Sequence, residues 1–342
     1  MIKLNTLHLF ALSILILSCS HQQFPVTDHS DGKMFYNEDR EVGVNKGLFD
    51  LLKWQLAGGK KDWPDHKDDN ETPQFVKKLG SEDVAVTFIN HATELIQLEK
   101  LTIITDPIFS ERASPFSWVG PKRHRKPGAE IAELPKIDVV VISHNHYDHL
   151  DIASLIELQK KDQPQIIVPL GTKAVLEESG IKNVTELDWW QNYKTQGVTI
   201  TLVPMQHWSA RGVFDRFEAL WGGYVFESAD LKILFAGDTG YNRQFKEIKE
   251  KLGAMDLSIL PIGAYEPRWF MKEQHLNPAD AVKAHQDLNS KLSIGTHFGT
   301  FQLTDEGIDD PIMDLETELQ SAKIDLKDFV APKNGQTIFL SK

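Results

Sequence analysis

The chain has 342 residues, of which 41% are hydrophobic and 25% are charged, and its formal net charge is -12 at pH 7. A chain of this length can bury one large core or two modest ones. The acidic balance argues against a sequence-wide attraction to nucleic acid or to an anionic membrane, although it leaves room for a local basic patch.

The first residues resemble the signal peptide of a bacterial lipoprotein. The apolar run Leu9–Leu17 is too short to span a bilayer comfortably, and it leads into Leu-Ser-Cys, which is similar to a lipobox. Cys19 is the only cysteine, so no intrachain disulfide can form. We therefore predict a signal peptide over residues 1–18 and lipidation of Cys19, with Ser20 favouring an outer-membrane address. An ordinary signal peptide or an uncleaved anchor is the alternative.

Residues 19–75 are interpreted as a tether and N-terminal arm because His, Asp, Lys, Asn and Gln are frequent there, with a short amphipathic helix expected near residues 48–56. Residues 76–342 form the predicted folded domain. Its β-rich runs cover residues 84–90, 94–99, 101–107, 138–144, 165–170, 198–204, 224–228, 231–238, 257–263, 292–298 and 337–340. Its helical patterns cover residues 153–161, 243–252, 279–288 and 313–323. This order predicts an α/β (α+β) fold in which a sheet sandwich is covered by helices.

Polar groups follow the apolar strand Val139–Ile142. His144, His146, Asp148 and His149 occupy the exit of this strand. Residues two apart in an extended segment project to the same side, so the first two histidines can approach one ion. The aspartate and the third histidine lie past a bend and could serve a second ion. Four ionisable groups in six positions are hard to satisfy without a metal.

Three later strands also end in a polar side chain, namely His207, Asp238 and His297. Taken alone, each is more simply interpreted as a satisfied core or cap residue. Together with the first cluster they give five histidines and two carboxylates, which are ligands suited to Zn²⁺ or a similar divalent ion.

The spacing HxHxDH, followed by His, Asp and His at later strand ends, resembles the signature of metallo-β-lactamase fold hydrolases. Longer strings are similar to the N-acylphosphatidylethanolamine-hydrolysing phospholipase D subfamily, namely TDPIFSERASP, GPKRHRKP, ELDWW, FAGDTGY, PIGAYEPRWFM, QHLNPADAV and HFGTF. The resemblance covers residues 75–340 and implies a four-layer αββα sandwich. It explains neither the lipobox nor residues 20–75.

The resemblance also implies a ligand set for two divalent metal ions per chain, with Zn²⁺ expected. The residues it implies are His144, His146 and His207 for one ion, Asp148, His149 and His297 for the other, and Asp238 as a bridge between them. Such a pair activates a shared water and neutralises charge on a phosphoryl group, so Asp148 and Asp238 would take part in catalysis.

Four further residues are candidates for supporting roles. Asp106 is expected to orient a histidine ligand through a hydrogen bond, and a turn cap is the alternative. Tyr147 and His275 match substrate-contacting positions, and His275 could also protonate the leaving group. A surface histidine at a helix edge is the alternative for His275. His91 ends a strand, and because the ligand set is already full, we interpret it as a structural histidine or as one that supports a ligand.

The function implied by this resemblance is hydrolysis of the phosphodiester of N-acylphosphatidylethanolamine, which gives an N-acylethanolamine and phosphatidic acid. A hydrolase of another phosphodiester, a lactone or an amide is the first alternative, and a metal-binding envelope protein without turnover is the second. The expected partners are a membrane phospholipid and, through the lipid anchor, the outer membrane facing the periplasm; a homodimer is left open. The basic run at residues 122–126 could attract lipid phosphate or form a solvated loop.

Overall fold

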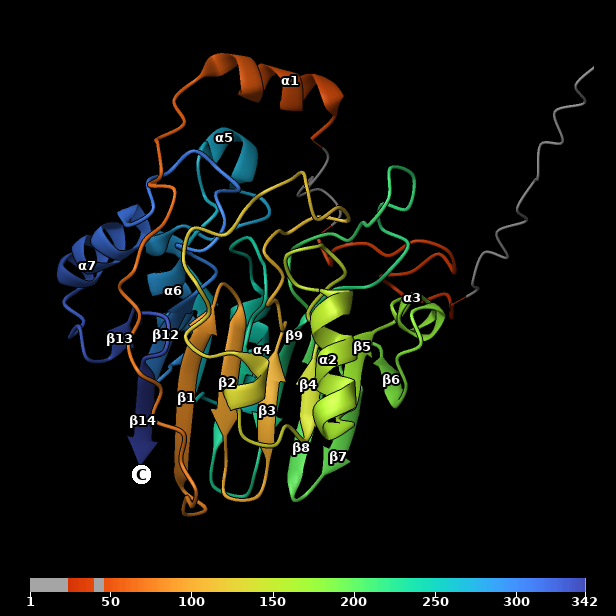
Figure 1. The fold of residues 1–342 in the computed structure, drawn as a ribbon, viewed down its shortest axis with the longest axis vertical. Helices are drawn as coiled ribbons and strands as arrows, with labels where there is room; N and C mark the ends of the chain where they lie inside the picture. The colour runs from red at the N-terminus through yellow and green to blue at the C-terminus, as the bar shows by residue number, and fades with distance from the viewer. Residues whose placement is uncertain (1–23, 40–45, 342) are drawn as a thin grey trace, which may run out of the picture.

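Two mixed β-sheets form the centre of the computed structural model, which describes residues 24–39 and 46–341 (Figure 1). The first seven-stranded sheet has the order β14 (Thr337–Ser341), β1 (Asp83–Asn90), β2 (Thr93–Gln97), β3 (Thr102–Thr105), β4 (Val139–Val141), β5 (Gln165–Pro169) and β6 (Val184–Leu187). The second seven-stranded sheet has the order β13 (Phe329–Val330), β12 (Leu292–Thr296), β11 (Leu257–Pro261), β10 (Lys232–Phe235), β9 (Gly223–Glu227), β8 (Val198–Val203) and β7 (Asn192–Thr195).

The strand directions bring one set of strand ends together. In the first sheet β1, β2 and β3 are antiparallel, whereas β3, β4 and β5 are parallel, so β1, β3 and β4 end at the same edge. In the second sheet β8, β9 and β10 are antiparallel, whereas β10, β11 and β12 are parallel, so β8, β10 and β12 also end at one edge. The residues that follow these six strands include every polar strand end singled out from the sequence.

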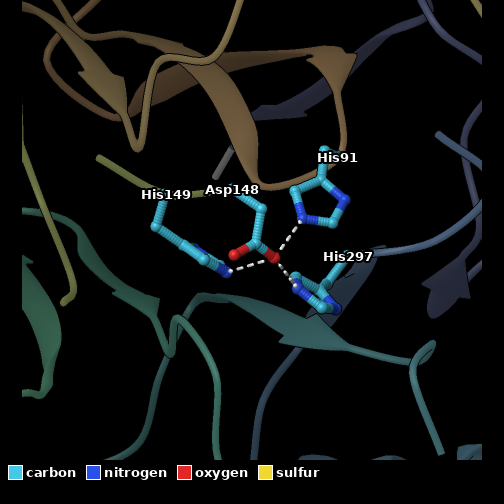
Figure 2. A group of neighbouring side chains, drawn as sticks. All are labelled: His91, Asp148, His149 and His297. Carbon is cyan, nitrogen blue, oxygen red and sulfur yellow. Dashed lines mark hydrogen bonds and ion pairs between the residues drawn. The ribbon is translucent and has the colours of Figure 1, made fainter. Parts of the chain in front are cut away.

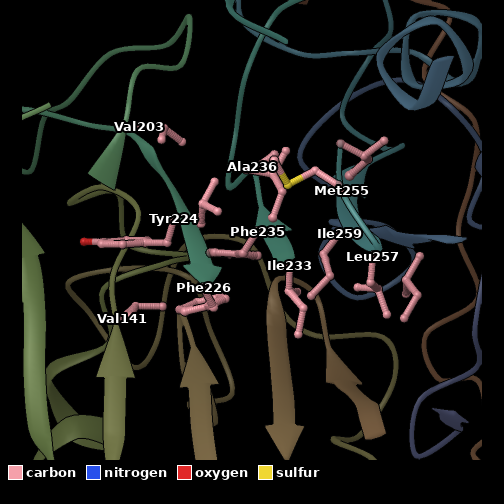
Figure 3. Close-up of a cluster of buried hydrophobic side chains, with 14 of the residues drawn as sticks. Val141, Val203, Tyr224, Phe226, Ile233, Phe235, Ala236, Met255, Leu257 and Ile259 are labelled. Atoms are coloured by element: carbon pink, nitrogen blue, oxygen red, sulfur yellow. The ribbon is translucent and has the colours of Figure 1, made fainter. Parts of the chain in front are cut away.

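Apolar side chains from both sheets form the main core. Val141 of the first sheet belongs to the same buried cluster as Phe226 and Ile259 of the second (Figure 3). The buried Tyr224 adds a polar link, because its hydroxyl donates to the carbonyl of Ile142 across the sandwich at 2.9 Å. Sheets that share a core in this way hold their loops at fixed relative positions.

Helices cover the sandwich on its outer faces and at one end (Figure 1). The described helices are α1 (Leu48–Ala57), α2 (Ile152–Asp162), α3 (Lys173–Glu178), α4 (Gln244–Leu252), α5 (Arg268–Met271), α6 (Pro278–Leu288) and α7 (Asp310–Ala322), together with a 3₁₀ helix at Ile131–Glu133. The start of α6 follows from its sequence, since the Asn277 side chain accepts from the backbone N–H of Asp280 at 2.9 Å and Pro278 occupies the first turn. The sandwich covered by helices and the helix near residues 48–56 are therefore confirmed.

Some expectations need correction. Neither interpretation of the basic run holds for Arg123 and Arg125, which are 6% and 5% exposed. The Arg125 guanidinium pairs with Asp69 and Asp309, so it ties the N-terminal arm to the domain and is not available to a lipid phosphate. The short elements α3, β6, β7, β13 and α5 were not expected, because they have too few residues to display a period.

The N-terminal arm packs closely on the domain. Phe35 is completely buried in the main core, and its N–H donates to the carbonyl of Phe217 at 2.9 Å. Among the described residues, no helix is long and apolar enough to cross a membrane. The predicted signal peptide at residues 1–18 and the predicted lipidation site Cys19 lie outside the described residues.

Candidate metal centre

Three histidines gather after β4 and β8. The ligand nitrogens of His144, His146 and His207 lie within 4.8 Å of one another. His146 Nδ1 is 2.8 Å from His144 Nε2 and 3.4 Å from His207 Nε2. Burial lowers the pKa of His146 to about 4 and holds the pKa values of His144 and His207 well below the ordinary value. The three rings are therefore neutral at pH 7, which is the form that binds a metal.

A second group surrounds the Asp148 carboxylate (Figure 2). Its Oδ2 atom is 3.0 Å from His91 Nε2, 3.3 Å from His149 Nε2 and 3.3 Å from His297 Nε2. Asp148, His149 and His297 are thus together, as predicted, and His91, which was not predicted to be a ligand, lies beside them. His91 follows β1 as Asp106 follows β3 and His144 follows β4, so its place at a strand end is the signal that could have predicted its contact with Asp148.

Asp238 lies between the two groups. Its Oδ2 atom is 3.2 Å from His149 Nε2 and 3.8 Å from His207 Nε2, while its Oδ1 atom is 3.2 Å from His297 Nε2. The preceding Gly237 makes this position possible, since its φ is 62° and an added Cβ would lie 2.5 Å from the Cβ of Ser143. One carboxylate thus faces histidines of both groups.

Buried hydrogen bonds fix the orientation of these rings. The Nδ1–H of His149 donates to Asp106 Oδ2 at 2.7 Å, and the Ser143 hydroxyl also donates to this carboxylate. The Nδ1–H of His207 donates to the carbonyl of Gln274 at 2.9 Å. In both rings the Nε2 atom is left to face the centre. Orientation of this kind is what metal-ligating histidines require.

The donor set fits a divalent cation. His146 Nε2 is buried without a hydrogen-bond partner, and His149 Nε2 and Asp238 Oδ1 face only other ionisable groups of the centre, so these atoms have capacity for a ligand. Burial alone would lower the pKa of His149, but the nearby carboxylates of Asp238 and Asp148 hold it well above its ordinary value. The electrostatics of the centre therefore favour a positive charge, and imidazole and carboxylate are the ligands that Zn²⁺ and similar ions take.

Backbone strain coincides with the centre. His91, Asp106 and His297 have φ angles of 49°, 34° and 59°, in the left-handed region that side chains other than glycine rarely adopt. Each of these residues directly follows a strand. Such strain at a polar cluster is typical of a functional site.

A cavity of about 490 Å³ opens beside the centre. Its polar floor includes His146, Asp148, Asp238 and His275, and its walls include Leu51, Trp54, Trp208, Arg216, Phe270, Met271 and Leu303. The His275 side chain is only 12% exposed, desolvation lowers its pKa to about 4, and its Nδ1 lies 3.7 Å from Asp238 Oδ2. His275 is thus not a surface histidine.

Tyr147 lies elsewhere. It lines a separate cavity, where its hydroxyl donates to the carbonyl of Arg211 at 3.0 Å and the Arg211 guanidinium lies 4.1 Å from the centre of its ring. The structure therefore brings His275, but not Tyr147, to the cavity beside the metal ligands. A role of Tyr147 in substrate binding stays a prediction.

Comparisons with known proteins show the family to which the chain belongs. A family model described as "Beta-lactamase superfamily domain" matches residues 102–298. The chain is 43% identical over 330 residues to the N-acyl-phosphatidylethanolamine-hydrolyzing phospholipase D 1 of Caenorhabditis elegans, which covers 90% of this chain and 92% of the relative. It is 38% identical over 237 residues to the mitochondrial N-acyl-phosphatidylethanolamine-hydrolyzing phospholipase D of Saccharomyces cerevisiae, covering 67% of this chain and 50% of the relative.

A solved metallo hydrolase from the archaeon Ignicoccus hospitalis has a similar fold, with a TM-score of 0.58 and 20% sequence identity over 76% of this chain and 99% of that one. This likeness confirms the sandwich expected from the sequence. Because the sequence identity is low, it carries no information on the substrate.

Proposed function

Since the chain belongs to the beta-lactamase superfamily and, within it, to the family of N-acyl-phosphatidylethanolamine-hydrolyzing phospholipases D, we propose that it hydrolyses N-acylphosphatidylethanolamine to an N-acylethanolamine and phosphatidic acid. It is a metal-dependent hydrolase by its family and by its donor set. The observation that carries the choice of substrate is that one cavity is lined both by carboxylates of this centre and by apolar side chains of α1 and α5.

We propose that His144, His146 and His207 hold one divalent ion, that Asp148, His149 and His297 hold a second, and that Asp238 contacts both. Zn²⁺ is the metal we expect, since neutral imidazole and carboxylate suit it. When bound, two such ions lower the pKa of a shared water and neutralise charge on phosphoryl oxygens.

The other residues of the cavity suit a phospholipid. Trp54, Phe270 and Met271 offer apolar walls, and burying acyl chains against such walls is favourable by about 0.8 kcal/mol per methylene. Arg216 adds a positive charge to the lining, which complements the phosphate of the substrate. The neutral ring of His275 lies next to Asp238, where it can hydrogen-bond an oxygen of the phosphodiester or of the leaving alcohol.

The location we propose is the bacterial envelope. Cleavage before Cys19 and acylation of this residue would anchor the chain at the outer membrane, facing the periplasm. The exposed side chains of α1 support a position against lipid, because Phe49 and Leu56 are 87% and 86% exposed on the helix that also borders the cavity.

The test is product analysis by mass spectrometry after incubating the zinc-loaded, full-length protein with vesicles that contain N-acylphosphatidylethanolamine. The expected products are an N-acylethanolamine and phosphatidic acid in equal amounts. Release of a free fatty acid would instead indicate cleavage of an ester or of the amide. If this phospholipid is left intact while a lactone or another phosphodiester is hydrolysed, the proposed substrate is wrong and the metal chemistry stands.

A further inference from the structure

The main chain of the metal-ligand candidate His207 is held by a residue of the N-terminal arm. The Nδ2–H of Asn37 donates to the His207 carbonyl at 2.9 Å, and the His207 N–H donates to Asn37 Oδ1 at 3.1 Å. Asn37 is 7% exposed, and its Oδ1 also accepts from Trp221 Nε1 at 3.2 Å. One side-chain amide therefore satisfies both peptide groups of a residue that is 170 positions away in the chain.

Asn37 takes the place of a neighbouring strand. On one side of the segment after β8, Gln206 pairs with the segment that carries Asp238, since the Gly240 N–H donates to its carbonyl and its own N–H donates to the Thr239 hydroxyl, both at 2.9 Å. The peptide groups of His207 face the other side. Without the Asn37 amide, these two buried groups would lose the partners that the structure gives them.

The imidazole of His207 is held separately. Its Nδ1–H donates to the Gln274 carbonyl, which fixes the rotation of the ring, while Asn37 fixes the Cα position from which the ring extends. Nε2 then reaches toward His146 and Asp238. Ligand geometry at a metal is sensitive to small shifts of the ligating atom, so both restraints bear on metal affinity.

The arm itself is firmly attached at other points. His29 Nε2 lies 2.7 Å from Asp188 Oδ1, and the His29 ring stacks on Trp189 with a centroid distance of 4.5 Å. Phe35 is fully buried two residues before Asn37. The arm can thus serve as a rigid support for the amide.

We propose that Asn37 is a positioning residue of the metal centre. The N-terminal arm then contributes to the site, although the arm lies outside residues 102–298, the region that the family model matches. The inference goes beyond the proposed function and does not depend on which substrate is hydrolysed.

The experiment measures metal release from the full-length, zinc-loaded protein into an excess of a chromophoric chelator. Asn37→Ala is expected to accelerate the release of one ion about 10- to 100-fold, and to leave the release of the other ion within about twofold. Asn37→Asp keeps the acceptor for the His207 N–H but replaces the donor with a carboxylate oxygen that faces the His207 carbonyl. Asn37→Asp is expected to accelerate release of the same ion. If Asn37→Ala gives no folded protein, the release rate of Asn37→Asp tests whether Asn37 positions His207.

Two controls separate positioning from general loosening of the arm. His29→Ala removes the contact with Asp188 without touching His207, so it should lower the Tm while leaving both release rates unchanged. Asn70→Ala removes another side-chain amide of the arm, one that donates to the carbonyls of Lys126 and Pro127, and it should leave the release rates unchanged.

Release rates in folded Asn37 variants that match the wild type would overturn the proposal, as would equal acceleration by His29→Ala. Absence of phospholipid hydrolysis by the wild type would refute only the proposed function.

Discussion

Asp106 and His149 form a fully buried pair in which the Nδ1–H of the imidazole donates to the carboxylate at 2.7 Å. The carboxylate also accepts from the backbone N–H and the hydroxyl of Ser143, the residue before His144. Asp106 therefore supports histidines of both groups in the centre. This arrangement agrees with the predicted orienting role of Asp106, which is tested as follows.

Asp106→Asn should weaken metal binding by about 10- to 100-fold, because an amide accepts a weaker hydrogen bond than a carboxylate and can present its NH₂ group to the histidine. Equilibrium competition with a chelator of known affinity measures this effect. Asp138→Asn is a suitable control, since Asp138 caps a backbone N–H at the opposite end of β4. An Asp106→Asn protein with unchanged metal affinity would leave Asp106 as a turn cap only.

The metal-free protein should lose stability as the pH falls from about 6.5 toward 4. Burial lowers the pKa of His146 and of His275 to about 4 and that of His91 to about 3, whereas the ordinary value is 6.5. Between these values the three rings bind more protons in the unfolded chain than in the folded chain, so their protonation favours unfolding, while Glu38, whose pKa burial raises to about 7, contributes in the opposite direction. Each pKa unit corresponds to about 1.4 kcal/mol per group.

Thermal unfolding of the chelator-treated protein at a series of pH values measures this dependence. The Tm should be nearly constant from pH 7 to 8 as far as these three histidines are concerned, and it should decline below pH 6.5. His285→Gln provides a control for a histidine outside the centre. A Tm that is the same at pH 7 and at pH 5 would show that the three rings are not buried in their neutral form.

His275→Ala should impair hydrolysis of N-acylphosphatidylethanolamine about ten- to a thousandfold and should impair hydrolysis of a small activated phosphodiester much less. The small substrate has a good leaving group and little to orient. Asp238→Asn should reduce both activities, because Asp238 faces histidines of both groups. The decisive quantity is the ratio of the two activities at equal metal content. Equal losses on both substrates would place His275 in the common chemistry, and no loss on either would remove it from the site.

Cys19→Ala should release the protein from membranes, since acyl chains on this cysteine are the predicted anchor. Cell fractionation followed by immunoblotting measures the partition. A matched variant, Ser20→Ala, retains the cysteine and should stay with the membrane. A Cys19→Ala protein that still sediments with membranes would indicate that the apolar segment at residues 9–17 or the catalytic domain provides the attachment.

The sequence by itself determined the sandwich and the polar strand ends. Alternating and apolar runs predict strands because side chains in a strand alternate between two faces, and the start of α6 is encoded locally by Asn277 and Pro278. The close spacing of His144, His146, Asp148 and His149 after one strand likewise predicts a metal site, because groups so near in sequence must be near in space. Resemblance to the family then implied the distant ligands.

Only the tertiary structure placed His91 beside Asp148 and Asn37 beside His207. A single histidine or asparagine is not part of a repeating sequence pattern that would predict its contacts. Its partner depends on which strand ends lie at the same edge and on how the arm packs against the domain. Arg125 shows the same dependence, since its basic neighbours suggested an exposed run whereas Asp69 and Asp309 hold it in the interior. Local sequence determines which side chains follow the end of a strand. The long-range packing of the two sheets and the arm determines which of these side chains come into contact.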